Sequence, residues 1–261
     1  MQISLIITTY NRPDALLLVM KSVERQSLVP NEVIIADDGS NKKTQELIDN
    51  FIIHSNLNII HSFQKDKGFR AAKSRNKAIS KSTGDYIVLI DGDMILHHNF
   101  IYDHKKNAQN GYFTQGSRAL LSQKKSDEVL GGSYLAFNIL SNGLNNRKNA
   151  LHSNLLSKLF SRKKNYLRGL KTCNVSFYKK DCISVNGFNN NFEGWGREDS
   201  EFFVRLMNKG VKRKTLRFNA IQYHLWHEVV SRKSLLKNDQ LLQKAIDENL
   251  DWCEMGIQHF L

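Results

Sequence analysis

Three acidic pairs in this sequence could take part in chemistry, and Asp91 with Asp93 is the pair best suited to a metal. The two carboxylates flank Gly92 directly after the apolar run YIVLI. Carboxylates on one tight turn offer oxygen ligands to Mg²⁺ or Mn²⁺, which usually keep positions for water and substrate phosphate. Asp and Gly also favour ordinary turns without any ligand. The position after a buried strand favours the metal site.

A second acidic pair, Asp37 and Asp38, ends another apolar run. These carboxylates can accept hydrogen bonds from a nucleobase or ribose, or they can cap the following helix. We expect one to cap and the other to bind. Arg70 and Arg75 lie in the helix predicted at 70–82, and an arginine at a helix N-terminus suits phosphate. The alternative is that these basic side chains form a solvated face.

The third pair, Glu198 and Asp199, follows a tryptophan placed between two glycines in the stretch GWGREDSEF. The glycines allow a loop that exposes Trp195, whose ring can stack on a sugar or a base. The two acids fall at a predicted helix N-terminus, where the helix dipole stabilises the ionised form. An ionised carboxylate beside a bound hydroxyl can act as a general base. The alternative is that Trp195 is a core anchor and the acids cap the helix.

Two histidines, His224 and His227, lie near the end of a predicted strand in the stretch YHLWHE. A metal site built on two carboxylates has room for a third protein ligand. We expect one of these histidines to supply it if this strand end lies near Asp93. We also expect the tryptophan loop and its acids to face the Asp-Gly-Asp turn across one cleft.

The elements that position these residues alternate in the first half of the chain. Apolar, β-branched runs predict strands at 3–9, 32–40, 57–63 and 85–93, and helical patterns fill 14–26, 42–53 and 70–82. Such alternation indicates βαβ units with a parallel sheet, in which ligands bind at the carboxyl ends of the strands. Further strands are predicted at 112–121, 172–178 and 219–227, and helices at 197–210 and 232–250.

Composition fits a globular protein with an anionic partner. The 261 residues are 41% hydrophobic and carry a formal net charge of +13. No run approaches the roughly 18 apolar residues that indicate a membrane span. The N-terminus lacks the basic and small-residue features of a signal peptide, so we expect a cytoplasmic protein. The charge indicates nucleic acid, a membrane surface or a phosphorylated substrate as partner, or it serves solubility alone.

Together these motifs resemble glycosyltransferase family 2, whose members have the GT-A fold. The matching stretches include LIITTYNRPDALLLVMKSVERQS, EVIIADDGS, GFRAAKSRNKAI, DYIVLIDGDM and the block from Cys173 to Gly210. The later block resembles the galactosyltransferase-type half of bacterial capsule and chondroitin polymerases. The resemblance implies an α/β fold with a Rossmann-like, mostly parallel sheet flanked by helices. It also implies a nucleotide-sugar donor, usually UDP-linked, a divalent metal (Mn²⁺ or Mg²⁺), and inversion at the anomeric carbon.

The resemblance also implies roles for individual residues. Those that match the donor pocket are Thr8, Tyr10, Asp37, Asp38, Arg70 and Asp91. Those that match metal ligands are Asp93, Asp91 and His224, with His227 in reserve. Trp195 matches the aromatic residue that stacks on the acceptor. Asp199 matches the catalytic base, and Glu198 matches a residue that holds acceptor or donor hydroxyls.

These expectations combine into one function and two rivals. We expect a single domain at 1–230, with a nucleotide-binding half at 1–110 and an acceptor half at 111–230, followed by a helical extension at 231–261. The expected reaction moves a hexose or N-acetylhexosamine from a UDP-sugar to a glycan or lipid-linked acceptor in bacterial surface polysaccharide synthesis. The rivals are a basic nucleic-acid-binding protein and a nucleotidyltransferase. Acidic strand ends argue against nucleic acid, because without a metal they would repel phosphate.

One stretch departs from the family pattern. Residues 151–171 combine apolar Leu155, Leu156, Leu159 and Phe160 with a basic run that includes Arg162, Lys163, Lys164, Arg168 and Lys171. An apolar cluster beside basic residues can rest on an anionic membrane surface. It can equally form a loop over the acceptor cleft. The first alternative places the protein peripherally at the inner membrane.

Overall fold

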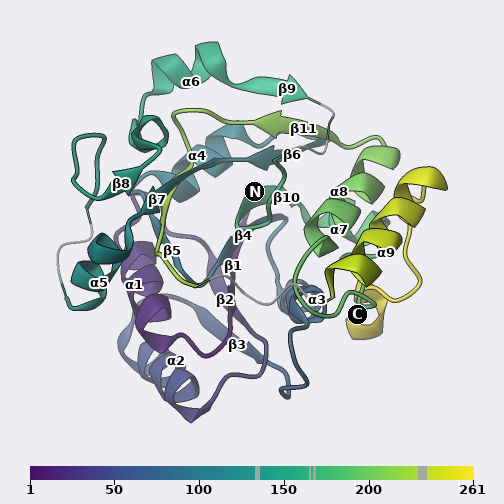
Figure 1. The fold of residues 1–261 in the computed structure, drawn as a ribbon, viewed down its shortest axis with the longest axis horizontal. Helices are drawn as coiled ribbons and strands as arrows, with labels where there is room; N and C mark the ends of the chain where they lie inside the picture. The colour runs from purple at the N-terminus through teal and green to yellow at the C-terminus, as the bar shows by residue number, and fades with distance from the viewer. Residues whose placement is uncertain (133–135, 165, 167–168, 229–233) are drawn as a thin grey trace.

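The computed structural model describes residues 1–132, 136–164, 166, 169–228 and 234–261 (Figure 1). Strands and helices alternate in the first part of the chain, as predicted. They are β1 (Ile3–Thr9), α1 (Pro13–Glu24), β2 (Glu32–Asp37), α2 (Lys42–His54), β3 (Ile59–Phe63), α3 (Ala71–Lys81) and β4 (Tyr86–Asp91). β1 pairs in parallel with β2 and β4, and β2 pairs in parallel with β3. The predicted βαβ arrangement is therefore confirmed.

Helices cover both faces of this parallel sheet. Because successive residues of a strand point to opposite faces, Leu5 and Ile7 of β1 pack on one side and Ile6 on the other. The first side also contains Leu16 and Val19 of α1, while Ile6 shares its cluster with residues of α3. Burial on both faces explains why β1 and β2 are apolar at nearly every position.

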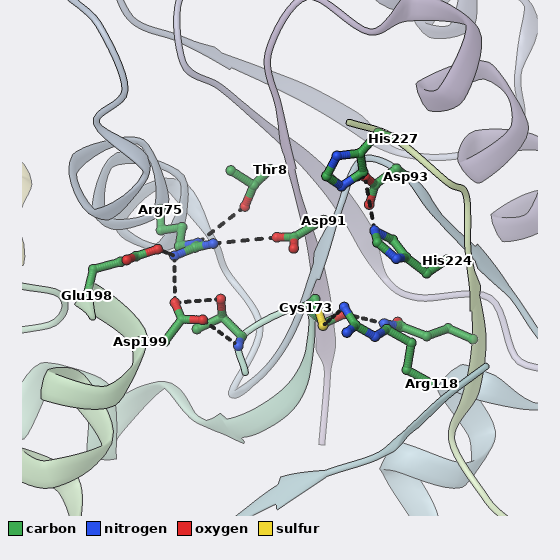
Figure 2. A network of polar contacts seen from close by, with 12 residues as sticks. Thr8, Arg75, Asp91, Asp93, Arg118, Cys173, Glu198, Asp199, His224 and His227 are labelled. Atoms are coloured by element: carbon green, nitrogen blue, oxygen red, sulfur yellow. Dashed lines mark hydrogen bonds and ion pairs between the residues drawn. The ribbon is translucent and has the colours of Figure 1, made fainter. Parts of the chain in front are cut away.

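The large sheet continues with strands from the second half of the chain, in the order β3-β2-β1-β4-β10-β6-β11-β9. The added strands are β10 (Asn174–Tyr178), β6 (Tyr112–Gln115), β11 (Lys212–Thr215) and β9 (Arg162–Lys164). β10 runs antiparallel to both of its neighbours, β4 and β6. The flanking helices are α4 (Phe100–Asn107), α7 (Lys179–Ser184) and α8 (Glu198–Asn208). This placement brings the start of α8 to the same region as the end of β4 (Figure 2).

A smaller sheet carries the predicted histidine strand. Its order is β5 (Met94–Leu96), β12 (Ile221–His224), β7 (Ser117–Leu121) and β8 (Leu144–Asn145). The prediction of one strand over 112–121 is wrong, because the chain leaves the large sheet at Gly116 and enters the small one. A Cβ on Gly116 would lie 2.4 Å from the Ala220 carbonyl oxygen, so the crossing requires glycine. Short elements follow: α5 (Gln123–Leu130), η1 (Arg147–Ala150) and α6 (Asn154–Phe160).

The C-terminal segment packs on the faces of α8 and α3. It contains α9 (Leu235–Asp247) and η2 (Ile257–Phe260). α9 lies against α8, and Ile257 joins the same buried cluster as residues of α3 and α8. The predicted boundary between residues 230 and 231 lies outside the described residues, so that division stays a prediction. No helix in the described ranges is both long enough and apolar enough to cross a membrane.

Candidate active site

The carboxyl ends of β1, β2 and β4 are neighbours at one edge of the large sheet. The parallel register places Thr8 beside Asp91 and Thr9 beside Asp37. Directly after β4 the chain turns over β1, and the Gly92 N–H donates to the Thr8 carbonyl oxygen at 2.7 Å. A Cβ on Gly92 would lie 2.9 Å from that oxygen. The Asp-Gly-Asp turn therefore needs glycine at its centre.

Arg75 of α3 joins acidic residues from distant parts of the chain (Figure 2). Its buried guanidinium lies 3.0 Å from Asp199, 3.2 Å from Glu198 and 3.4 Å from Asp91, measured from nitrogen to carboxylate oxygen. Its Nε also lies 3.4 Å from the Thr8 hydroxyl oxygen. One cation thus bridges the strand-end turn and the start of α8. The structure brings the two acidic regions together, as expected.

Three carboxylates surround this single guanidinium, so negative charge is in excess. Burial raises the pKa of Asp91 to about 6; Arg75 opposes the shift, and the charges of Asp93 and Asp199 add to it. Burial and the neighbouring Asp199 likewise raise the pKa of Glu198 to about 7, again against Arg75. Carboxyl groups that resist ionisation for these reasons are typical of sites that bind a cation or transfer a proton.

Asp199 is held in one orientation from two sides. Its Oδ2 accepts from the Thr172 backbone N–H at 2.9 Å, and its Oδ1 accepts from the Thr172 hydroxyl at 2.7 Å and from Arg75. The helix begins at Glu198 because Arg197, in the left-handed region at φ 75°, turns the chain into it. About a quarter of the Asp199 side chain remains exposed, at 24%. A fixed, accessible carboxylate can receive a proton from a bound hydroxyl.

A second cluster gathers Asp93, His224 and His227 on the other side of Asp91 (Figure 2). The Nε2 atoms of both histidines lie 3.4 Å from Asp93 Oδ2. Backbone pairing sets this geometry, because His224 sits beside Met94 of β5 and the Leu225 N–H donates to the Asp93 carbonyl oxygen at 3.0 Å. The predicted approach of the histidine strand to Asp93 is found, and it brings both histidines rather than one.

The donor atoms of this cluster suit a divalent cation. One ligand atom from each of the three side chains lies within 4.8 Å of the others. Asp93 Oδ1 is buried, and among the described residues no group donates a hydrogen bond to it. Two imidazoles with one carboxylate favour an ion such as Mn²⁺ over Mg²⁺, which prefers oxygen alone. Asp91, predicted as a ligand, lies outside this set and pairs with Arg75 instead.

Asp37, one of the predicted donor-binding residues, builds the turn after β2. Its Oδ1 accepts from the backbone N–H groups of Gly39 and Ser40, and its Oδ2 lies 2.9 Å from His61 Nε2. The side chain is fully buried. Asp37 therefore holds the turn that leads to α2, but it does not cap that helix as we expected for one of the pair, because the N-cap is Asn41. A direct contact between Asp37 and a donor finds no support in this geometry.

The other predicted donor residues gather where β1, β2 and β3 end. Asp38 accepts from the Arg70 backbone N–H at 2.7 Å and from the Gln64 side-chain amide. Tyr10 is 45% exposed, and its hydroxyl donates to Asp66 at 3.0 Å. This region lies beside the Arg75 network through Thr8, which belongs to the same strand end. It offers an aromatic ring, carboxylates and a guanidinium to a ligand at this edge of the sheet.

The tryptophan loop is held in place by contacts with other parts of the chain. Gly194 and Gly196 have φ values of +73° and +109°, which favour glycine. The Gly194 N–H donates to the Phe69 carbonyl oxygen at 2.9 Å, and the Asn238 side chain of α9 donates to the Gly196 carbonyl oxygen at 2.9 Å. Trp195 remains 39% exposed. A stacking surface is therefore presented beside the acids of α8.

Sequence reasoning missed several residues of this site. Arg75 was singled out as a basic residue of its helix, but no role as the bridge between acids was predicted. Thr172 and Asn238 carry no local signal, because their partners lie 27 and 42 residues away in the sequence. Arg12, whose Nη1 lies 2.9 Å from Asp93 Oδ2, belongs to an ordinary helix start. Only folding reveals these contacts.

Comparison with known proteins identifies the family. The profile described as glycosyl transferase family 2 matches residues 4–177, and one described as the N-terminal domain of galactosyltransferase matches residues 155–228. The chain is 26% identical over 242 residues to chondroitin synthase of Escherichia coli, covering 85% of this chain and 34% of that protein. It is 28% identical over 230 residues to hyaluronan synthase of Pasteurella multocida, covering 82% and 24%. The chain thus spans between about a quarter and a third of the length of these relatives.

Solved structures share the fold. TarS of S. aureus in complex with UDP superimposes with a TM-score of 0.64 at 15% identity, over 100% of this chain and 68% of that one. The complex of TarS with UDP-GlcNAc gives a TM-score of 0.63 at 16% identity, over 100% and 69%. The predicted GT-A architecture is confirmed. Because its profile matches well over half of the residues, this chain belongs to glycosyltransferase family 2 and carries a galactosyltransferase-type segment in its second half.

Proposed function

We propose that this chain transfers a hexose or N-acetylhexosamine from a UDP-sugar to a glycan or lipid-linked acceptor in bacterial surface polysaccharide synthesis, with inversion. One observation carries the proposal: Arg75 holds Asp199 and Asp91 in a single network beside the Asp93 cluster. Family membership supports sugar transfer. The UDP and UDP-GlcNAc complexes of the structural neighbour support the choice of donor.

Donor binding is assigned to the ends of the first three strands. Tyr10 is exposed enough to stack on a base, and Asp38 can accept from the base or from ribose. Arg70 and the start of α3 face the same edge of the sheet, where a helix N-terminus and a guanidinium suit phosphate. Thr8 connects this pocket to the acids, because Arg75 contacts its hydroxyl.

Asp93, His224 and His227 are the residues that would hold Mn²⁺ or Mg²⁺. A bound divalent cation neutralises the negative charge that develops on a departing diphosphate. Arg12 already places one positive charge at Asp93 Oδ2. The Asp93 carboxylate therefore attracts positive charge, whether that charge comes from Arg12 or from a bound metal ion.

Asp199 is proposed as the general base. It would take the proton of the acceptor hydroxyl while that oxygen attacks the anomeric carbon, so that the sugar is transferred in one displacement with inversion. Thr172 and Arg75 fix the plane of its carboxylate, and Trp195 offers a ring on which the acceptor can stack. Glu198 is assigned to hold a hydroxyl of either substrate.

The released product distinguishes this function from its rival. Purified protein incubated with a UDP-sugar, Mn²⁺ and glycan acceptor should release UDP, detected by a coupled nucleoside-diphosphate assay. Omitting Mn²⁺ should lower the rate. Release of pyrophosphate from a nucleoside triphosphate and a sugar phosphate, with no release of UDP, would instead assign a nucleotidyltransferase.

A peripheral contact with the cytoplasmic face of the inner membrane is also proposed. Leu155 and Leu159 of α6 are 70% and 67% exposed, and Phe160 is 46% exposed. Lys158 lies in the same helix and Arg162 lies two residues after its end, which suits an anionic lipid surface. Wild-type protein should co-sediment with vesicles that contain phosphatidylglycerol, and Leu155→Ser with Leu159→Ser should weaken this binding. Equal sedimentation of both proteins would refute the contact.

A further inference from the structure

Three neighbouring cavities lead away from the acids of the site. The first has a volume of about 350 Å³, the second about 340 Å³ and the third about 330 Å³. The first and second share Thr215 and Arg217 in their walls, and the second and third share Arg162. We call these three cavities together the basic track. Each is close to the lower end of the volumes of small-ligand pockets.

The walls of the basic track carry charge of one sign. Arg118, Lys171 and Arg217 line the first cavity, and Arg162 and Arg213 are added in the second. The third contains Lys106, Lys158, Lys163 and Lys214 besides Arg162. Among the described residues, no Asp or Glu lines any of the three. Cavities lined by positive charge concentrate anionic ligands.

Like charges lie close together in this region. Burial and the nearby Arg118 lower the pKa of Lys171. Burial and the nearby Lys163 lower the pKa of Lys214. A bound anion would relieve both repulsions. The track is therefore better suited to a negatively charged ligand than to a neutral one.

The inner end of the track lies next to the proposed base. Lys171 and Cys173 line the first cavity. Figure 2 shows Arg118 and Cys173 beside the acidic network. The outer end is formed by α4, α6, β9 and β11, which lie together at the top of Figure 1. Arg213 in the second cavity and Lys214 in the third point to opposite faces of β11. A chain in the track would therefore extend from Asp199 to the rim of the protein and pass around the edge strand β9 at Arg162.

We propose that the acceptor is a polyanionic glycan. Its growing end lies at Asp199, and preceding units that bear carboxylate or phosphate groups lie along the basic track. This inference rests on the proposed function, because it takes Asp199 as the point of transfer. The remaining walls favour sugar over nucleic acid. The first and third cavities contain Asn, Ser and Thr or Asn and Ser, which bond hydroxyls, and no aromatic ring on which a base could stack. The second contains the rings of Phe160 and Tyr166, on which a sugar or a base could stack, so a comparison with oligo(dT) decides between the two ligands.

The test is direct binding of defined oligomers to the full chain without donor. The probes are an unsulfated uronic-acid oligosaccharide, the same oligosaccharide with its carboxyl groups reduced to alcohols, a poly(glycerol phosphate) oligomer and an oligo(dT) of equal charge. The double variant Arg162→Gln/Arg217→Gln changes the two residues at which the cavities meet, and both are exposed. Its matched control is Lys42→Gln/Lys43→Gln, which removes the same charge from exposed positions of α2.

We expect one of the anionic glycans to bind wild type and the control alike, and to bind the Arg162/Arg217 variant about tenfold more weakly, since each lost contact is a charge-assisted hydrogen bond. The reduced oligosaccharide should bind poorly. Preference for the uronic-acid or the phosphate oligomer identifies the anionic group. Equal weakening by the control variant, tighter binding of oligo(dT), or binding of the reduced oligosaccharide as strong as that of the charged one would overturn the proposal.

Failure of this inference can be told apart from failure of the proposed function. UDP release from the donor by wild-type protein, with water as the only acceptor, reports the donor site without the track. If UDP is released but neither glycan binds, the track proposal is wrong and the transferase proposal stands. If a glycan binds as expected but no UDP is released under any condition, the transferase proposal is wrong and the track remains a binding site.

Discussion

Two arginines contact the carboxylates of this site, and they differ in burial and in number of partners. Arg75 is buried and lies within 3.4 Å of three carboxylates, from β4 and α8. Arg12 keeps 34% of its side chain exposed, and among the described residues Asp93 is the one carboxylate that it pairs with. Arg75 has the properties of a permanent part of the fold. Arg12 has the properties of a side chain that can move away when a cation or a diphosphate binds.

The same contrast separates the acids. Asp199 is held by Arg75 and by Thr172, so its orientation does not depend on a ligand. Asp93 shares one oxygen with Arg12 and two histidines, and its other oxygen is buried without a hydrogen-bond donor in the part of the chain that is described. A carboxylate of fixed orientation beside an incompletely satisfied Asp-Gly-Asp turn is the arrangement that the proposed function requires, in which metal and donor bind together.

The largest effect is expected from the proposed base. Asp199→Asn keeps the shape of the side chain but cannot take a proton, so turnover should fall by about 10³-fold. The affinity for UDP should stay close to that of wild type, because Asp199 lies apart from the donor pocket. Steady-state transfer rates and UDP binding by calorimetry measure the two quantities. A variant that transfers sugar at the wild-type rate would refute the assignment.

The next prediction tests the contrast between the arginines. Arg75→Met leaves three carboxylates around a buried apolar side chain and should lower the free energy of unfolding by about 3–5 kcal/mol. Arg12→Met should lower it by about 1 kcal/mol or less, because its ion pair is partly exposed. Urea denaturation measures both. If Arg75→Met is too unstable to purify, the double variant Arg75→Met/Glu198→Gln should recover part of the loss, since one of the unpaired charges is gone. Equal losses in the free energy of unfolding for Arg75→Met and Arg12→Met would contradict the distinction between the two arginines.

The metal cluster is tested by its histidines. His224→Ala and His227→Ala should each weaken Mn²⁺ binding by at least about tenfold. Loss of a residue that only hydrogen-bonds to a metal ligand can already weaken metal binding by this factor. His54→Ala is the matched control, because His54 is exposed on α2 and far from the cluster. Titration of Mn²⁺ followed by electron paramagnetic resonance measures the affinity. If only one of the two variants binds Mn²⁺ more weakly, the metal ligands are Asp93 and that histidine alone.

The smallest expected effect concerns pH. The pKa of Glu198 is raised to about 7 in the folded protein, so its contribution to stability is present at low pH and is lost as pH rises through that value. Glu198→Gln does not titrate. Its stability relative to wild type should therefore increase between about pH 5 and pH 8.5, by on the order of 2 kcal/mol at a rate of about 1.4 kcal/mol per pKa unit. Melting temperatures measure this change. Glu46→Gln, at an exposed position of α2, should show none, and parallel profiles for both variants would contradict the assigned pKa.

The first half of the fold could be predicted because its signals are local. A run such as ISLIITT is apolar on both faces and can only be a strand covered on both sides. The ends of such strands lie together in a parallel sheet, so Asp91, Asp93 and Asp38 could be placed near one another. The turn at Gly92 adds a close approach that glycine alone allows.

The second half could be predicted only in part, because distant contacts decide its geometry. Nothing near Gly116 reveals that Ala220 approaches it and divides one predicted strand into two. The acids at 198–199 were recognised as a pair, but the Thr172 hydrogen bonds that orient Asp199 depend on packing between β10 and α8. Basic residues around α6 and β9 could be counted in the sequence. That they line two cavities which share Arg162 emerges only from the folded chain.

The anomeric configuration of the product tests the account most directly. Transfer in one displacement, with Asp199 deprotonating the acceptor opposite the leaving diphosphate, predicts that an α-linked UDP-sugar yields a β-linked product. Proton nuclear magnetic resonance of the early product, recorded before any anomeric equilibration, distinguishes the two linkages. A β-linkage is the predicted result. An α-linkage would show retention and would contradict the role of Asp199 together with the single-displacement mechanism.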